Sequence, residues 1–191
     1  MDALARTKGL DPRDLRLASL APEHGRLKTV LKEAADMAGW ASRSATIDEA
    51  MGLACGIYKE MSYAAAVARV ARTADGYRVT GLWCAHDCGL VINPDQVRAQ
   101  VEGNLVWGIG MALREELTVE AGAISAESFF DYAMPVLSDV PDIQIRLLEG
   151  SPLPSGAGET AIVCATAAIT NAIAAMTGET VTRLPVRGAP A

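Results

Sequence analysis

The sequence predicts an α/β (α+β) domain in which a mixed sheet packs against helices. Three observations favour this class: capping signals at the starts of helices, extended runs joined by a tight-turn signal, and an uncharged helix near the C-terminus. The 191 residues are 50% hydrophobic and 21% charged, as in globular proteins. Intrinsic disorder and collagen-like repeats are therefore excluded.

The first 42 residues predict an N-terminal helical arm. Asp11 is typical of an N-cap, and Pro12 suits the first helical position. A second helix follows, because apolar residues recur with a helical period and Gly39 can end it. The members of this apolar set are Leu27, Val30, Leu31, Ala34 and Ala38. We expect residues 1–42 to form the arm and residues 43–191 to form the main subdomain.

Residues 52–86 predict a β-meander. Two extended runs flank Met61-Ser62, and Asp75-Gly76 is typical of a tight hairpin turn into a third run. The alanine-rich residues 63–71 favour a helix equally well by propensity, so a helix remains an alternative there.

A long helix is predicted over residues 94–117. Asn93 is typical of an N-cap, Pro94 suits the first position, and Gln96 can complete a capping box. Three glycines inside this helix each cost about 1 kcal/mol relative to alanine. They indicate close approach of a neighbouring backbone or a ligand, and a kinked, tightly packed helix is the alternative. These glycines are Gly103, Gly108 and Gly110.

The remaining residues predict a strand, a loop and a buried helix. Residues 142–148 alternate apolar and polar side chains, as a half-buried strand does, and residues 150–158 form a loop rich in glycine, serine and proline. Residues 160–178 carry no charge, but their threonines and alanines make a membrane span improbable and a buried helix the better interpretation. The aromatic pair Phe129-Phe130 is expected in the core.

Charge and cysteine content exclude several classes of function. The net charge of −6 disfavours binding to a phosphate backbone, which needs clustered cations. The four cysteines lack the dense spacing of secreted disulfide scaffolds, so free thiols are expected. The N-terminus lacks the layout of a signal peptide, and the sequence does not identify a compartment.

The most informative stretch is Gly156-Ala157-Gly158-Glu159. Small residues that lead into a helix present backbone N–H groups to an anion or polar ligand. Glu159 is expected at the helix start, where the positive helix end favours the carboxylate form that a general base requires. A glutamate that simply caps the helix is the alternative.

Three side chains raise the question of a metal. Cys84, His86 and Cys88 would face one side of an extended strand, which is compatible with metal binding. No fourth ligand is close in the sequence, and buried cysteines commonly pack as small hydrophobic groups. The sequence therefore predicts no metal-ligating side chain.

Five motifs together resemble the C-terminal region of the molybdenum hydroxylases, the xanthine dehydrogenase and aldehyde oxidoreductase family. The similarity spans nearly the whole chain in the family's order. Residues 9–12, 170–173 and 183–185 look most like the bacterial isoquinoline 1-oxidoreductase β-subunit branch. The five motifs are residues 87–94, 100–103, 108–110, 130–132 and 156–159.

The resemblance implies a molybdopterin cofactor carrying molybdenum, usually the cytosine dinucleotide form in bacteria. Glu159 matches the family's catalytic glutamate, the general base in hydroxylation of a heteroaromatic ring or oxidation of an aldehyde with water. Gln100 matches a glutamine that hydrogen-bonds near the molybdenum centre. Gly156, Ala157 and Gly158 match the backbone that lines this centre.

The resemblance also implies partners. Family subunits are several hundred residues long, so this chain resembles the final portion of a large subunit. The remainder of that subunit and a small [2Fe–2S] subunit are the expected partners, and the isolated chain is expected to be inactive. A free-standing, non-catalytic accessory or interaction module is the alternative. Departures from the family pattern leave the substrate unidentified, and they are Ala99, Asn104, Trp107 and Thr160.

Overall fold

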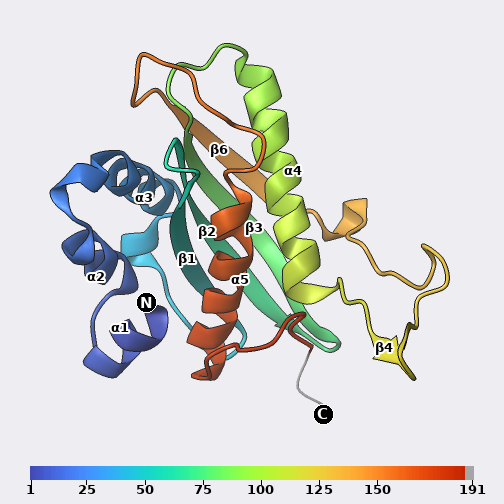
Figure 1. Ribbon diagram of the computed structural model, residues 1–191. Helices are drawn as coiled ribbons and strands as arrows, with labels where there is room; N and C mark the ends of the chain where they lie inside the picture. The colour runs from blue at the N-terminus through green and yellow to red at the C-terminus, as the bar shows by residue number, and fades with distance from the viewer. Residues whose placement is uncertain (188–191) are drawn as a thin grey trace.

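A mixed four-stranded sheet with helices on both faces forms the body of the molecule (Figure 1). The computed structural model describes residues 1–187. Strands follow the order β1-β2-β3-β6, in which β1, β2 and β3 are antiparallel neighbours and β6 pairs with β3 in parallel. The predicted α/β class, with a mixed sheet and packed helices, is confirmed.

The chain contains five α-helices, six strands and three short 3₁₀ helices within residues 1–187. The α-helices are α1 (Asp2–Lys8), α2 (Pro12–Ser19), α3 (Gly25–Met37), α4 (Pro94–Leu113) and α5 (Ile162–Thr177). The strands are β1 (Glu49–Tyr58), β2 (Ser62–Thr73), β3 (Gly76–Asp87), β4 (Val119–Glu120), β5 (Ala123–Ile124) and β6 (Asp142–Leu148). The 3₁₀ helices are η1 (Pro22–His24), η2 (Trp40–Ser42) and η3 (Leu137–Asp139).

Small residues in the meander allow helix α5 to lie directly on the sheet. The alanine-rich run forms strand β2, not a helix, because β2 lies between β1 and β3 and its narrow side chains are buried. Gly52 of β1 has no space for a side chain, since an added Cβ would lie 2.1 Å from the Ala172 nitrogen of α5. The alanine content thus produces close packing between helix and sheet.

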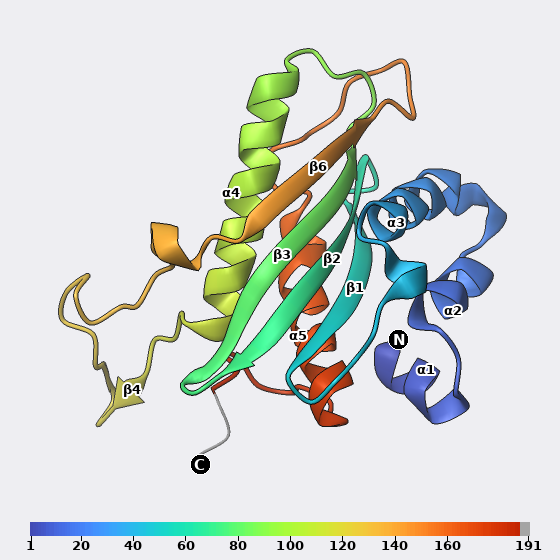
Figure 2. The same cartoon turned by 180° about the vertical axis from the view of Figure 1, so that it is seen from behind.

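Two hydrophobic cores lie on opposite faces of the sheet. Helices α4 and α5 cover one face, and α3 covers the other (Figure 2). The predicted apolar set of the second helix, residues 27–38, packs with Trp40 and Trp83 on the α3 face. The division at residue 42 stays a prediction, and residues 188–191 of its second unit lie outside the described residues.

The predicted N-caps Asp11 and Asn93 are confirmed, whereas the predicted end of the long helix is not. Asp11 accepts hydrogen bonds from the Arg13 and Asp14 nitrogens at 2.8 and 3.2 Å, and Asn93 accepts one from the Gln96 nitrogen at 3.1 Å. Helix α4 ends at Leu113, so the predicted end at residue 117 is wrong. No helix within residues 1–187 has the length and apolar character needed to cross a membrane.

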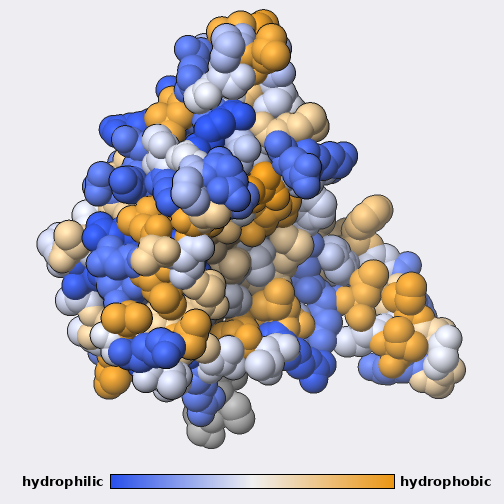
Figure 3. Space-filling view, turned by 60° about the vertical axis from the view of Figure 1, so that its left-hand side comes forward, coloured by the Kyte–Doolittle hydropathy of each residue, from blue (hydrophilic) through white to orange (hydrophobic). Residues whose placement is uncertain are grey.

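Residues 114–141 form an extension that projects away from the body and carries the small β4–β5 hairpin (Figure 1). Phe129 and Phe130 are 88% and 101% exposed, so the expectation that this pair lies in the core is wrong. The pair is exposed because the extension leaves the sheet, and a polar contact that joins it to the body is the hydrogen bond from Arg78 of β3 to the Ser138 carbonyl at 3.0 Å. Apolar side chains gather on this projecting part of the surface (Figure 3).

Candidate functional site

The loop that contains residues 156–159 lies at the end of the sheet where the parallel strands β3 and β6 both end. This edge is the usual ligand-binding position in sheets with parallel strands. Ser155 fixes the loop, because its backbone nitrogen and its hydroxyl both donate to the Cys88 carbonyl at 2.8 Å. The same hydroxyl lies 3.1 Å from the Met61 carbonyl in the β1–β2 turn.

Asp87 anchors the same end of the sheet. Its carboxylate accepts two hydrogen bonds from Arg26, at 2.9 and 2.6 Å, and further bonds from the Gly89 and Gly150 nitrogens at 2.8 and 3.2 Å. Burial raises the pKa of Asp87, but these hydrogen bonds and the charge of Arg26 outweigh burial and hold the pKa below its ordinary value. The ionised carboxylate therefore ties α3 to both loops that flank the site.

Glu159 is exposed, and its carboxylate accepts a hydrogen bond from the Tyr58 hydroxyl at the end of β1. Helix α5 begins at Ile162, three residues later than Glu159, so the expected position at the helix start is wrong. The alternative of a helix-capping glutamate is also wrong, because no side chain of the α5 N-cap residue or of Glu159 caps the helix. Instead, the Ile162 nitrogen donates to the Asn104 side chain of α4 at 3.1 Å.

Sequence reasoning did not identify Tyr58 or Asn104 as site residues. Asn104 is 7% exposed and bridges α4 to the loop, since its amide nitrogen donates to the Gly158 carbonyl at 2.8 Å. The sequence signal that could have identified Asn104 is its position as a polar residue between Gly103 and the apolar pair Leu105-Val106. Tyr58 carried no comparable signal, because only the fold brings it next to a residue 101 positions away.

Gln100 and the glycine loop lie side by side in the structure. Gln100 and Ala157 line one cavity of about 280 Å³, and the Gln100 Oε1 atom lies 3.7 Å from where a Cβ on Gly158 would be. Within residues 1–187 the Gln100 side chain makes no hydrogen bond, which leaves its carboxamide available to a ligand. Glu159 does not line this cavity, since its carboxylate is turned toward Tyr58.

These residues fit one wall of a large polar cofactor site. A Cβ on Gly156 would meet nothing within 4 Å, so the loop backbone is open to a neighbouring group. The cavity of about 280 Å³ is smaller than the roughly 300–1,000 Å³ of complete ligand sites. The Gln100 carboxamide and the backbone of residues 156–158 are therefore the parts of this wall that are open to a ligand.

The cysteines and His86 do not assemble into a metal centre. No group of three His, Cys, Asp or Glu residues within residues 1–187 is placed to hold a metal ion. Hydrogen bonding with Cys84, together with complete burial, raises the pKa of Cys164 well above its ordinary value, so this thiol stays protonated in the core.

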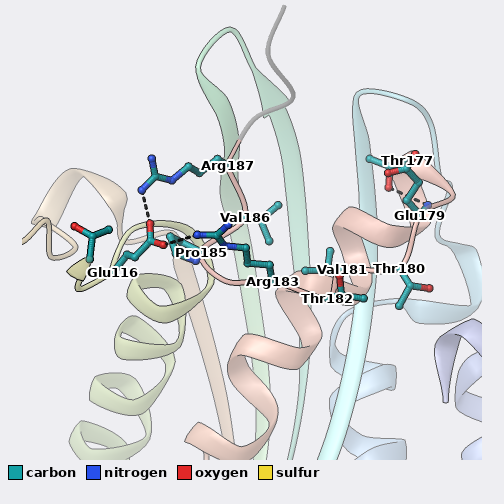
Figure 4. Close-up of a pocket in the computed structure, with 11 residues that line it drawn as sticks. Glu116, Thr177, Glu179, Thr180, Val181, Thr182, Arg183, Pro185, Val186 and Arg187 are labelled. Carbon is teal, nitrogen blue, oxygen red and sulfur yellow. Dashed lines mark hydrogen bonds and ion pairs between the residues drawn. The ribbon is translucent and has the colours of Figure 1, made fainter. Parts of the chain in front are cut away.

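A second cavity lies at the opposite end of α4 and α5 and contains none of the predicted site residues. Its volume is about 580 Å³, and Glu116 lies there with Arg183 and Arg187 (Figure 4). Arg183 and Arg187 both pair with the Glu116 carboxylate, the former at 3.1 Å. The Glu116 carboxylate is thus shared by the two arginines of this cavity.

Comparison with known proteins relates the chain to one group of enzymes. Residues 3–141 match the family model of the molybdopterin cofactor-binding domain, a match that ends before the loop carrying Glu159. The chain is 37% identical over 194 residues to the isoquinoline 1-oxidoreductase subunit beta of Brevundimonas diminuta, covering 99% of this chain. The alignment covers 24% of that relative, so the chain spans about a quarter of its length.

Two solved structures have the same fold over part of the chain. Quinoline 2-oxidoreductase from Pseudomonas putida is 35% identical with a TM-score of 0.58, over 61% of this chain and 16% of that chain. Aldehyde oxidoreductase from Desulfovibrio desulfuricans is 28% identical with a TM-score of 0.57, over 65% of this chain and 14% of that chain.

Proposed function

Because the chain belongs to the molybdopterin cofactor-binding domain family, we propose that it forms the C-terminal part of a molybdenum hydroxylase large subunit. The proposed reaction is hydroxylation of a heteroaromatic ring, or oxidation of an aldehyde, with water as the oxygen source. Names of the relatives support these substrate classes, since they include isoquinoline, quinoline and aldehyde oxidoreductases. The observation that carries the proposal is the position of Glu159, exposed after an open glycine loop beside the Gln100 carboxamide, which makes no hydrogen bond within residues 1–187.

Each site residue has a distinct proposed role. When bound, the molybdopterin cofactor, in its cytosine dinucleotide form, supplies the electron-accepting centre of the reaction. Gln100 and the backbone of residues 156–158 hold one side of it. Glu159 accepts the proton of the water-derived nucleophile at a carboxylate oxygen, as a general base must, and Tyr58 directs that carboxylate by its hydrogen bond.

The proposed partners are the remainder of the large subunit and a small [2Fe–2S] subunit. Support comes from the 114–141 extension, where eight large apolar side chains are more than half exposed. Soluble monomers rarely expose so large an apolar surface, so a protein partner is expected to cover it. The eight are Leu117, Val119, Ile124, Phe129, Phe130, Met134, Val136 and Leu137.

Charge defines the chemistry of the surface that covers the extension. The extension has six acidic residues and one basic residue, Arg114, so it accounts for most of the chain's net charge of −6. A complementary surface is apolar with a basic rim. We assign this surface to the remainder of the large subunit, because the chain spans only about a quarter of the length of its isoquinoline relative.

Glu159→Gln tests the proposed function in the assembled enzyme. The substitution keeps the shape of the side chain and removes the base, so turnover should fall below detection while folding and molybdenum content stay near normal. Turnover rates and molybdenum content of the purified assembly provide the two measurements. If Glu159→Gln retained activity, Glu159 would not be the base, and the non-catalytic accessory module would be favoured.

Gln100→Ala tests the proposed contact with the cofactor. Loss of the carboxamide removes its donor and acceptor from the cavity wall but leaves α4 intact, since the side chain is exposed and makes no hydrogen bond within residues 1–187. Molybdenum occupancy after dialysis should therefore decrease. Glu102→Ala, at an exposed position of the same helix outside this cavity, is the matched control and should keep the wild-type occupancy. Unchanged molybdenum occupancy in Gln100→Ala would show that Gln100 does not contact the cofactor.

A further inference from the structure

We propose that Asn104 is a positioning residue that sets the location of Glu159. Its side chain lies on α4, outside the loop, and contacts the backbone on both sides of Glu159. This inference rests on the proposed role of Glu159 as the general base, and it adds a second residue on which that role depends.

The side chain of Asn104 makes three hydrogen bonds. Its amide nitrogen donates to the Gly158 carbonyl at 2.8 Å and to the Gln100 carbonyl at 2.6 Å. Its amide oxygen accepts from the Ile162 nitrogen at 3.1 Å. One carboxamide therefore links the residue before Glu159, the first residue of α5 and the backbone of Gln100.

Because Asn104 is buried, its hydrogen bonds determine the position of the loop backbone. Asn104 is 7% exposed, so water cannot readily replace its hydrogen bonds. The Ile162 nitrogen is one of the unpaired donors at the start of α5, and the α5 N-cap residue Ala161 supplies no side-chain acceptor. Asn104 thus caps α5 from a neighbouring helix and fixes where the chain turns from the loop into α5.

A second, independent contact fixes the residue that follows Glu159. The Thr160 hydroxyl is fully buried, lies 2.7 Å from the Ser62 hydroxyl and is 3.3 Å from the Gly156 carbonyl. Between this anchor and Gly158 lies only Glu159, whose exposed carboxylate accepts the hydrogen bond from Tyr58. Without Asn104, the Gly158 carbonyl loses its partner, and the flexible glycine backbone can move the carboxylate.

The expected effect is on the rate of the chemical step. A displacement of about 1 Å of a catalytic group can reduce rates by about 100-fold, so Asn104→Ala should lower kcat by about this factor. KM should change little, because Asn104 is buried and cannot reach the substrate. Asn104→Asp keeps the acceptor for the Ile162 nitrogen and removes the two donated bonds, so its kcat should also fall.

Asn171→Ala is the matched control. Asn171 is a half-buried asparagine on α5 that donates to the Leu53 carbonyl at 3.0 Å, with no contact to the 156–160 loop. It should lower stability in the same way as Asn104→Ala and leave kcat near that of the wild type. Equal decreases of kcat in both variants would show a general structural effect and overturn the proposal.

Hydrogen exchange gives a readout that does not depend on activity. In the assembled enzyme, amide exchange measured by mass spectrometry should accelerate in peptides that span residues 158–162 of Asn104→Ala and Asn104→Asp. Peptides of β2 should remain unchanged. Wild-type exchange in this segment, or wild-type kcat in either Asn104 variant, would overturn the proposal.

Glu159→Gln separates failure of this inference from failure of the proposed function. Activity in Glu159→Gln would contradict the proposed function whatever the Asn104 variants do. An inactive Glu159→Gln enzyme together with fully active Asn104 variants would leave the proposed function standing and overturn only the positioning role.

Discussion

His86 is a buried histidine that has no hydrogen-bond partner for either ring nitrogen within residues 1–187. Its side chain is inaccessible to solvent, on β3 opposite Ala64 of β2. Burial lowers the pKa of His86 from 6.5 to about 4, although the negative charge of Asp87 acts in the opposite direction. The imidazole is therefore neutral at pH 7, and its protonation at low pH should destabilise the folded chain.

The sign of the pH effect follows from this depressed pKa. Below pH 6.5 His86 is protonated in the unfolded chain, whereas in the folded chain it becomes protonated only near pH 4. The free energy of unfolding is therefore at its full value above pH 6.5 and decreases as the pH falls toward 4. The loss should be about 3 kcal/mol. Denaturant titrations of the chain at pH 7 and pH 4 should show this loss in the wild type and only a small part of it in His86→Leu.

Asp87 provides the control for that experiment. Its pKa is below the ordinary 3.8, so its contribution to stability is present above pH 3.8 and is lost only as the pH falls further. The contribution of Asp87 is therefore largely retained between pH 6.5 and pH 4, and the difference between the wild type and His86→Leu in this window reports on His86. An equal decrease in the wild type and in His86→Leu would contradict this account.

At the scale of elements, two glycines of α4 differ in their surroundings, because one packs against α5 and the other lies on an open face of the helix. A Cβ on Gly108 would lie 2.4 Å from the Ala165 Cβ of α5, whereas a Cβ on Gly103 would meet nothing within 4 Å. The expected close approach of a neighbouring backbone is confirmed at Gly108. Gly103 remains compatible with a neighbour that this chain does not contain.

The two glycines give opposite predictions on one helix. Gly108→Ala should destabilise the chain by about 1–3 kcal/mol, because the methyl group overpacks the α4–α5 contact. Gly103→Ala should stabilise it by up to about 1 kcal/mol through helix propensity. Thermal unfolding of the chain measures both effects. A similar change in the two variants would contradict the packing argument.

The elements were largely predictable because they depend on local signals. The caps Asp11 and Asn93, the Asp75-Gly76 turn and the alternation in residues 142–148 act through neighbouring residues, and each element formed where expected. The end of α4 was missed by four residues, because the chain leaves the helix at Arg114 to enter the extension. The contacts of Tyr58 and Asn104 with the loop were not predictable, since they join residues 54 to 101 positions apart.

At the scale of the whole molecule, the 114–141 extension is the feature least suited to an isolated chain. Phe129 and Phe130 are almost completely exposed, and burying two such side chains is worth about 3–6 kcal/mol. Replacing both with serine should weaken association with the remainder of the large subunit by at least about a hundredfold. Co-purification and sedimentation of the assembly measure this association.

Ile47→Ser is the matched control for the extension. Ile47 is 73% exposed and precedes β1, away from residues 114–141, so its replacement should not affect assembly. If the double serine variant assembled as tightly as the wild type and Ile47→Ser, the extension would not be the docking surface. The proposed role of Glu159 would be unaffected by that result.

The molybdenum content of the native assembly tests the central claim most directly. An antibody to this chain captures the protein from its source, and metal analysis with denaturing electrophoresis gives the molybdenum-to-protein ratio and the polypeptide sizes. We expect nearly stoichiometric molybdenum in an assembly much larger than this 20.0 kDa chain. A 20.0 kDa species without molybdenum would contradict the account and favour an accessory module that keeps the fold without the chemistry.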